Sequence, residues 1–184
     1  MTHPTEPLEL DLLTALDEIA AEASAPSAAL RASVLASRGS LLPLAGLAPR
    51  LATFLDLPAE RVETLLRAAG RAAEPPWVDD GVRGVRVLHF EGGSRHAGAD
   101  CGLVHVPAGT RYPSHRHLGE EWVFVLSGSA EEEETGEHWG PGDLYRRVAG
   151  SSHAFRAIGS VPFVFAIVLR EGIALEELPA PPAA

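Results

Sequence analysis

The sequence predicts an α+β protein, in which a small all-α region at the N-terminus precedes an all-β barrel or sandwich. Three observations predict this class. Apolar residues recur at helical spacing over roughly the first 70 residues. After about residue 81 the apolar period changes to two, and Gly/Pro turns separate the segments. Between the two regions lies Pro-Pro-Trp at 75–77, and consecutive prolines cannot continue a helix.

The N-terminal region reads as three or four short amphipathic helices. The pattern begins at Leu8 and restarts after Pro26; a further helix runs from about Pro43 to Leu55, and the last begins at Pro58. The acidic residues lie mostly off the apolar stripes and are expected on a solvated face. We expect a helical domain over residues 1–74, a linker over 75–82, a β domain over 83–178 and a disordered tail over 179–184.

Six segments of the C-terminal region alternate or cluster apolar residues as strands do. Turn signals such as Ser127-Gly and Gly140-Pro-Gly separate them. Many short strands with even spacing indicate a barrel or sandwich. The expected strands are Val85–Phe90, Cys101–Val106, Glu121–Leu126, Asp143–Val148, His153–Ile158 and Val161–Leu169.

Composition excludes several classes of partner. The formal net charge of −10 opposes direct binding to nucleic acid, which requires clustered basic residues. The longest apolar run, Val161–Leu169, is too short to cross a bilayer and contains Pro162. A single cysteine, Cys101, excludes an intramolecular disulfide and suits a reducing compartment. We therefore expect a soluble cytoplasmic protein that does not bind membranes.

The stretch from Gly109 to Gly128 contains a candidate metal site. His115, His117 and Glu121 all occupy odd positions, and side chains of equal parity share a face on an extended chain. Imidazoles and a carboxylate each offer a lone pair to a divalent transition metal. The best candidate for a fourth ligand is His153, which follows a turn at the start of a distant strand.

These stretches resemble the two motifs of the cupin superfamily. Gly109, His115, His117, Glu121 and Gly128 fill every position of the first motif. In the second motif Gly142, Gly150 and His153 are present, whereas Val148 replaces the usual Pro and Ala157 replaces the usual Asn. The resemblance implies a double-stranded β-helix (an RmlC-like jelly roll), with the metal inside the barrel mouth. Zinc is the first expectation for that metal, with iron, manganese and nickel as alternatives.

The order of parts is similar to the ChrR-type cupin anti-sigma factors. The likeness covers nearly the whole chain, strongly in the cupin motifs and weakly in the helices. It implies that residues 8–72 bind an extracytoplasmic-function sigma factor and that the cupin domain binds zinc and responds to singlet oxygen or organic peroxide. The helical domain of that family also holds zinc through a His-x-x-x-Cys-x-x-Cys motif, which this sequence lacks.

Two other functions fit the same motifs. A cupin dioxygenase would use Fe(II) or Mn(II) to activate oxygen on a small chelating dicarbonyl substrate, with Tyr112, Tyr145 and Arg147 as candidate pocket residues. A cupin could also bind a small ligand at the metal without turnover. A homodimer, paired through strand edges, is plausible under each of these functions.

The remaining polar residues are expected to be structural. Trp77 should pack the linker onto one domain, Glu120 should point away from Glu121, and Cys101 should be a buried, inert thiol. Glu131–Glu134 should form a solvated strand or hairpin edge. Four histidines are expected as polar side chains at a barrel edge: His89, His96, His105 and His138.

Overall fold

The computed structural model describes residues 44–74 and 76–176. Within these residues, two helices and two short 3-10 turns accompany eleven strands. The helical elements are η1 (Leu44–Leu47), α3 (Ala48–Leu55), α4 (Ala59–Ala69) and η2 (Ser94–His96). The strands are β1 (Val78–Asp79), β2 (Arg86–Phe90), β3 (Asp100–Val106), β4 (Arg111–His117), β5 (Glu121–Ser127), β6 (Ser129–Glu132), β7 (His138–Trp139), β8 (Leu144–Arg147), β9 (Ser152–Ile158), β10 (Phe163–Leu169) and β11 (Ile173–Leu175).

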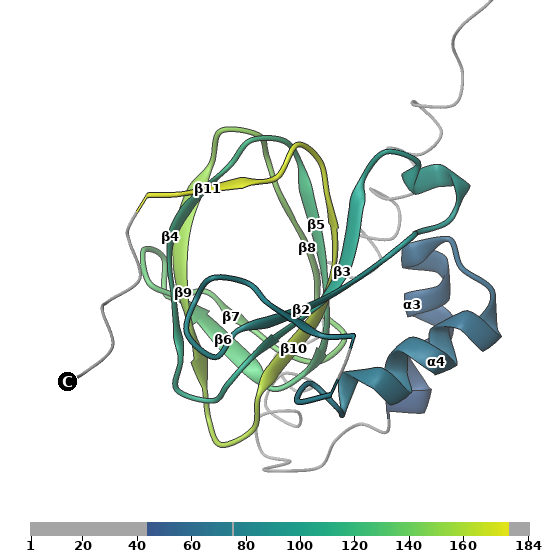
Figure 1. Cartoon of the computed structure of the whole chain (residues 1–184). Helices are drawn as coiled ribbons and strands as arrows, with labels where there is room; N and C mark the ends of the chain where they lie inside the picture. Colours follow the sequence, from purple (N-terminus) through teal and green to yellow (C-terminus); the bar gives the residue numbers. More distant parts are fainter. Residues whose placement is uncertain (1–43, 75, 177–184) are drawn as a thin grey trace, which may run out of the picture. The chain divides into compact units, whose positions relative to one another are not determined.

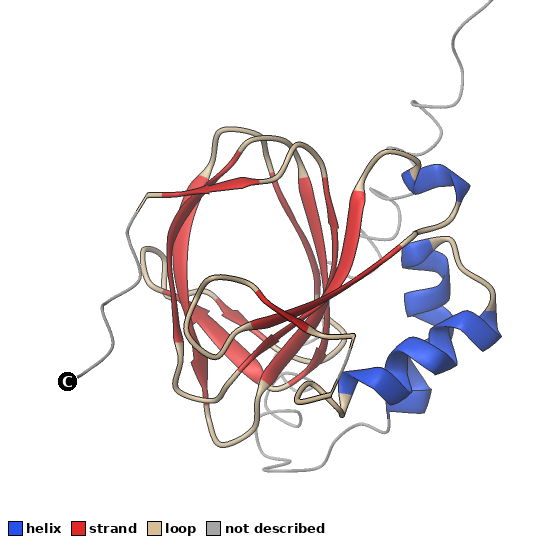
Figure 2. Ribbon diagram, in the orientation of Figure 1, coloured by secondary structure: helices blue, strands red, loops and turns tan. Residues whose placement is uncertain are grey.

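The strands form two antiparallel sheets that face each other as the walls of a barrel (Figures 1 and 2). One sheet has the order β1-β2-β3-β10-β5-β8 and the other β11-β4-β9-β6-β7. This confirms the expected double-stranded β-helix. The six predicted strands are all present with shifted ends. β4 was expected only as an extended stretch that carries His115 and His117. β1, β6, β7 and β11 were not predicted, because segments of two to four residues are too short to show a period of two.

The barrel encloses one apolar core, to which both sheets contribute alternate residues. Val123 and Val125 of β5, Phe165 of β10 and Phe155 of β9 are among its buried members. The ladder between β4 and β9 shifts register between Tyr112 and His115. This irregularity lets Tyr112 share the interior with His115 although the two positions differ in parity.

The described helices confirm the last two predicted helical segments. Leu51, Phe54 and Leu55 are the buried residues of α3, and the buried face of α4 includes Val62 and Leu66. In both helices the buried residues lie three or four positions apart, as expected for amphipathic helices. The segments expected before residue 44, and the tail from residue 179, lie outside the described residues.

Helices α3 and α4 belong to the same compact unit as the barrel, Leu41–Ala184. The ring of Phe54 stacks on that of Phe124 of β5, with 5.8 Å between centroids. The guanidinium of Arg50 lies over the same ring at 5.2 Å. The domain boundary proposed near residue 74 stays a prediction, and these contacts fix α3 on the outer face of the first sheet.

The C-terminal end of α3 is bonded to the connection between β2 and β3. The last carbonyls of a helix have no partner within the helix. Here the Arg95 side chain donates to the oxygen of Thr53 at 3.0 Å, His96 Nε2 to that of Phe54 at 2.7 Å and the Gly93 amide to that of Leu55 at 2.9 Å. The expectation that His96 is a polar side chain at a barrel edge is wrong, since it is buried under α3.

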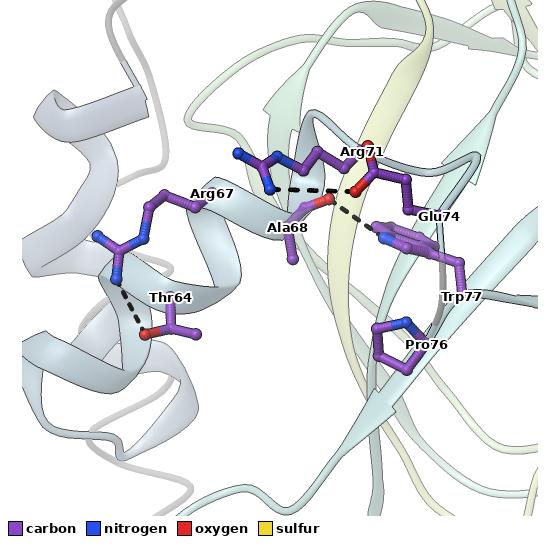
Figure 3. A pocket seen from close by; sticks show the side chains of 7 residues that line it. All are labelled: Thr64, Arg67, Ala68, Arg71, Glu74, Pro76 and Trp77. Atoms are coloured by element: carbon purple, nitrogen blue, oxygen red, sulfur yellow. Dashed lines mark hydrogen bonds and ion pairs between the residues drawn. The ribbon is translucent and has the colours of Figure 1, made fainter.

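Trp77 packs as predicted. It is buried, and its Nε1 donates to the carbonyl of Ala68 at 3.1 Å, near the end of α4 (Figure 3). Arg67 and Arg71 line the shallow groove beside it. Among the residues that the structure describes, no helix is long and apolar enough to cross a membrane.

Candidate metal centre

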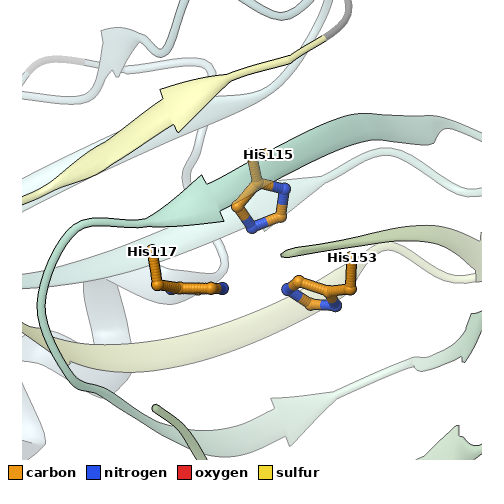
Figure 4. Close-up of side chains that lie close together, drawn as sticks. All are labelled: His115, His117 and His153. Carbon is orange, nitrogen blue, oxygen red and sulfur yellow. The ribbon is translucent and has the colours of Figure 1, made fainter. Parts of the chain in front are cut away.

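Three histidines from two neighbouring strands meet inside the barrel (Figure 4). His115 and His117 lie on β4, and His153 lies directly opposite His115 in the ladder to β9. One nitrogen of each ring lies within 4.8 Å of those of the other two. All three side chains are buried, with 3%, 0% and 4% exposed.

The hydrogen bonds of these rings leave lone pairs free for a metal. His115 Nδ1 lies 3.0 Å from the carbonyl of Pro113, which can only accept, so Nδ1 carries the proton and Nε2 the lone pair. Both nitrogens of His117 and of His153 are buried without a hydrogen-bond partner among the described residues. Buried polar atoms are rarely left unpaired, and a bound divalent metal would satisfy one nitrogen of each ring.

Burial keeps these imidazoles neutral, which is the state that binds a metal. It lowers the pKa of His117 to about 4 and that of His153 to about 2, with Arg147 adding to both shifts. Burial also lowers the pKa of His115. Three neutral imidazoles at one point form a ligand set typical of zinc and of other borderline cations.

Glu121 also faces the three histidines. Equal parity along one strand, the reason predicted from the sequence, does not explain this. Residues 118–120 leave β4, and Glu121 begins β5 in the opposite sheet. It faces the histidines because both sheets turn one face toward the shared interior. Its Oε2 lies 3.6 Å from His117 Nδ1, and burial raises its pKa to about 8. Glu120 points away, as predicted, and pairs with Arg146.

Sequence reasoning missed Glu132. The expectation that Glu131–Glu134 form a solvated edge is wrong at this position: Glu132 is 3% exposed, whereas Glu133 and Glu134 are exposed. Its Oε1 lies 2.8 Å from Arg147 Nη2 and 3.4 Å from His153 Nδ1. The available signal was the period of two that places Glu132 on the face of buried Ala130, but four consecutive glutamates concealed it.

The candidate pocket residues also line the interior. Tyr145 stacks on Trp139 with 4.6 Å between centroids, and Arg147 lies over the Trp139 ring at 4.9 Å. The Tyr112 ring packs edge-on against His115, and its hydroxyl donates to Asp80 at 2.6 Å. Aromatic rings thus lie beside two of the histidines, Tyr112 against His115 and Trp139 against His153.

Cys101 and the other histidines lie away from this centre. Cys101 is buried on the face of β3 opposite the barrel core, next to Gly92, which agrees with the prediction of a buried thiol. His89 and His138 are exposed and contact Asp100 and Glu131, respectively. His105 packs edge-on against Trp77.

Comparison with known proteins identifies the family. The model of the ChrR Cupin-like domain matches residues 67–167, more than half of the chain. This chain belongs to the ChrR cupin-like family. The matched residues include the end of α4, the two strands that carry the histidines, and Glu132 of β6. The family assignment therefore covers the whole candidate metal centre.

One curated relative of this ChrR-like chain is an enzyme. Over 73 residues the chain is 41% identical to dimethylsulfoniopropionate lyase DddQ of Ruegeria pomeroyi. The match covers 38% of this chain and 35% of the lyase, so the chain spans about a third of the relative that it matches.

Two solved structures show weaker likenesses. Rhodobacter sphaeroides SigE in complex with the anti-sigma ChrR aligns with a TM-score of 0.49 and 25% identity, over 86% of this chain and 77% of that chain. An acetylacetone dioxygenase from Acinetobacter johnsonii aligns with a TM-score of 0.46 and 17% identity, over 55% and 72%.

Proposed function

We propose that this protein is a ChrR-like regulator whose cupin domain binds a divalent metal and senses an oxidant or a small molecule. Membership of the ChrR cupin-like family is the observation that carries the proposal. The bound ligand would shift the protein between two states that differ in affinity for a partner. The proposed partner is an extracytoplasmic-function sigma factor, bound through residues 8–72 in the cytoplasm.

The contacts of β5 support a link between the metal centre and the helices. Glu121, at the start of β5, faces His117 inside the barrel. Three residues later, Phe124 projects from the opposite face of the same strand and stacks on Phe54 of α3. A displacement of Glu121 on ligand binding would therefore reach α3 through one rigid strand.

The partner proposal is tested by co-expressing the full chain with sigma factors encoded in the same genome. We expect one of them to co-purify with the chain and to lose transcriptional activity in its presence. Treatment with peroxide or a source of singlet oxygen should release it. If every sigma factor stays active and unbound, the regulatory proposal is wrong.

We further propose that the metal is zinc, held by His115, His117, Glu121 and His153. Three unpaired or half-paired imidazoles and a buried carboxyl form a ligand set that zinc accepts, while iron, manganese and nickel remain alternatives. Metal analysis of protein purified without added metal decides among them. A metal-free protein that also fails to take up zinc would contradict the site itself.

A second candidate function is a metal-dependent enzyme, favoured by the 41% identity to a dimethylsulfoniopropionate lyase. To test lyase activity, the protein is loaded separately with each metal and the consumption of dimethylsulfoniopropionate is monitored by NMR. Oxygen uptake with a panel of diketones tests the dioxygenase alternative. Turnover that is lost in a His153→Ala variant would favour an enzyme over a regulator, and flat traces in both assays would count against it.

A further inference from the structure

The pair formed by Glu132 and Arg147 lies against the metal centre, and neither residue belongs to the proposed ligand set. Both side chains are largely buried, with 4% and 17% exposed. Burying an ion pair usually gains little stability, because removing both charges from water costs about as much as their attraction returns. The position of this pair next to His153 therefore requires another explanation.

Both oxygens of Glu132 have partners that fix the carboxylate. Oε1 lies 2.8 Å from Arg147 Nη2, and Oε2 accepts a hydrogen bond from the hydroxyl of Thr135. The same Oε1 lies 3.4 Å from Nδ1 of His153. Glu132 thus presents a fixed negative oxygen to one ring nitrogen of a single histidine.

Glu132 is not placed as a further ligand. The group of mutually close ligand atoms contains only the three histidines and no oxygen of Glu121 or Glu132. Glu132 differs from Glu121 because both of its oxygens already have partners, Arg147 and Thr135. Of the three histidines, it contacts His153. A metal-binding histidine commonly donates its second N–H to a carboxylate, which fixes the tautomer and the ring orientation and increases the basicity of the ligand nitrogen.

We propose that Glu132 is the positioning residue of the metal centre: when a metal is bound, the 3.4 Å contact between its Oε1 and Nδ1 of His153, which is not a hydrogen bond in this structure, becomes one, so that Nε2 faces the metal while Arg147 balances the charge. His115 shows the same arrangement with a backbone oxygen, because its Nδ1 is held by Pro113. The inference rests on the proposed metal site and extends it beyond the ligands.

The test measures metal affinity and ligand geometry in the full chain. Co(II) is titrated against a competing chelator, and the visible absorption of the bound Co(II) is recorded. We expect Glu132→Ala to weaken Co(II) binding about 10- to 100-fold, the range found for outer-shell partners of metal ligands, and to shift the absorption bands. Glu132→Gln, which keeps an acceptor oxygen without the charge, should lose less affinity. Glu131→Gln is the matched control, since Glu131 precedes Glu132 on β6 and contacts His138 at the surface, and it should leave both readouts unchanged.

A double variant separates positioning from structural support. Glu132→Ala alone leaves Arg147 buried without its partner and can destabilise the fold for that reason. Glu132→Leu combined with Arg147→Met removes both charges. We expect the double variant to recover thermal stability and still bind Co(II) weakly, with shifted bands.

The outcomes also distinguish this inference from the metal site on which it rests. Wild-type affinity in the double variant, or in Glu132→Ala, would show that Glu132 is structural only and would overturn the inference while the site stands. Failure of the wild-type chain to bind Co(II) or Zn(II) would overturn both.

Discussion

At the scale of single residues, the candidate metal centre depends on three histidines whose ring nitrogens make few other interactions. His117 and His153 are buried without hydrogen-bond partners among the described residues. Such atoms destabilise a fold unless something pairs with them. The cost of leaving them unpaired in the metal-free protein is the physical reason to expect a tightly bound ion.

Replacing any one of the three histidines should therefore remove most of the metal affinity. His115→Ala, His117→Ala and His153→Ala should each lose zinc during purification, because two imidazoles cannot hold the ion as three do. Metal content per chain is the measurement. His138→Ala serves as the control, since His138 is exposed on β7, and equal zinc content in all four variants would contradict the site.

Glu121 provides a sharper residue test because its neighbour is a matched control. Glu121→Gln should reduce zinc affinity, since it removes the proposed anionic ligand. Glu120→Gln, which changes only the outward partner of Arg146, should bind zinc as the wild type does. Competition with a chromophoric chelator measures both, and identical affinities would remove Glu121 from the ligand set.

At the scale of elements, the connection between β2 and β3 holds the end of α3. A Cβ atom added at Gly93 would lie 1.8 Å from the backbone oxygen of Asp56, although the φ of Gly93 (−69°) is ordinary. Gly93→Ala should therefore destabilise the protein by about 1–3 kcal/mol through steric overlap alone. Urea unfolding measures this.

Gly70→Ala is the control for that prediction, because nothing lies within 4 Å of a Cβ at Gly70 and its φ is −81°. Its stability should stay within about 0.5 kcal/mol of the wild type. If both variants unfold at the same denaturant concentration, the close contact between α3 and the connection is not maintained in solution.

His96 makes the attachment of α3 dependent on pH. Its Nε2–H donates to the carbonyl of Phe54, and burial, opposed in part by that hydrogen bond, lowers its pKa. The charged groups nearby are Arg95, Asp56 and Arg170. Because the unfolded chain takes up a proton near pH 6.5 and the folded chain does so at lower pH, stability is lost as the pH falls below about 6.5.

His96→Gln keeps a donor for the Phe54 carbonyl and removes the titration. The variant should lose less stability than the wild type between pH 7.5 and pH 5.5, as measured by urea unfolding at each pH. Equal losses in the two proteins would show that protonation of His96 is not coupled to folding.

At the scale of the whole molecule, a metal bound at the candidate centre would be linked to folding. An ion that binds only the folded chain, present at a hundred times its dissociation constant, stabilises it by about 2.7 kcal/mol. For a chain of this length each kcal/mol raises Tm by about 2–4 °C. Zinc should raise Tm of the wild type accordingly, a chelator should reverse the rise, and His153→Ala should show no rise. An equal rise in His153→Ala would place the zinc elsewhere.

The sequence by itself determined the class of fold and most of the residues of the candidate metal centre. Spacing of apolar residues predicted the helices ending near Leu55 and Ala69, because a helix with one buried face imposes that period locally. The turn signals predicted the main strands for the same local reason. His115 and His117 were found together because they lie on one strand.

Only the tertiary structure decided which distant residues meet. His153 lies opposite His115 through the pairing of β4 with β9, and Glu121 arrives from the other sheet. Glu132 could not be separated from three neighbouring glutamates, and His96 could not be separated from the exposed histidines, because a sequence period does not say what covers a face. Burial is a property of the assembled sheets and helices, and burial gives these residues their chemistry.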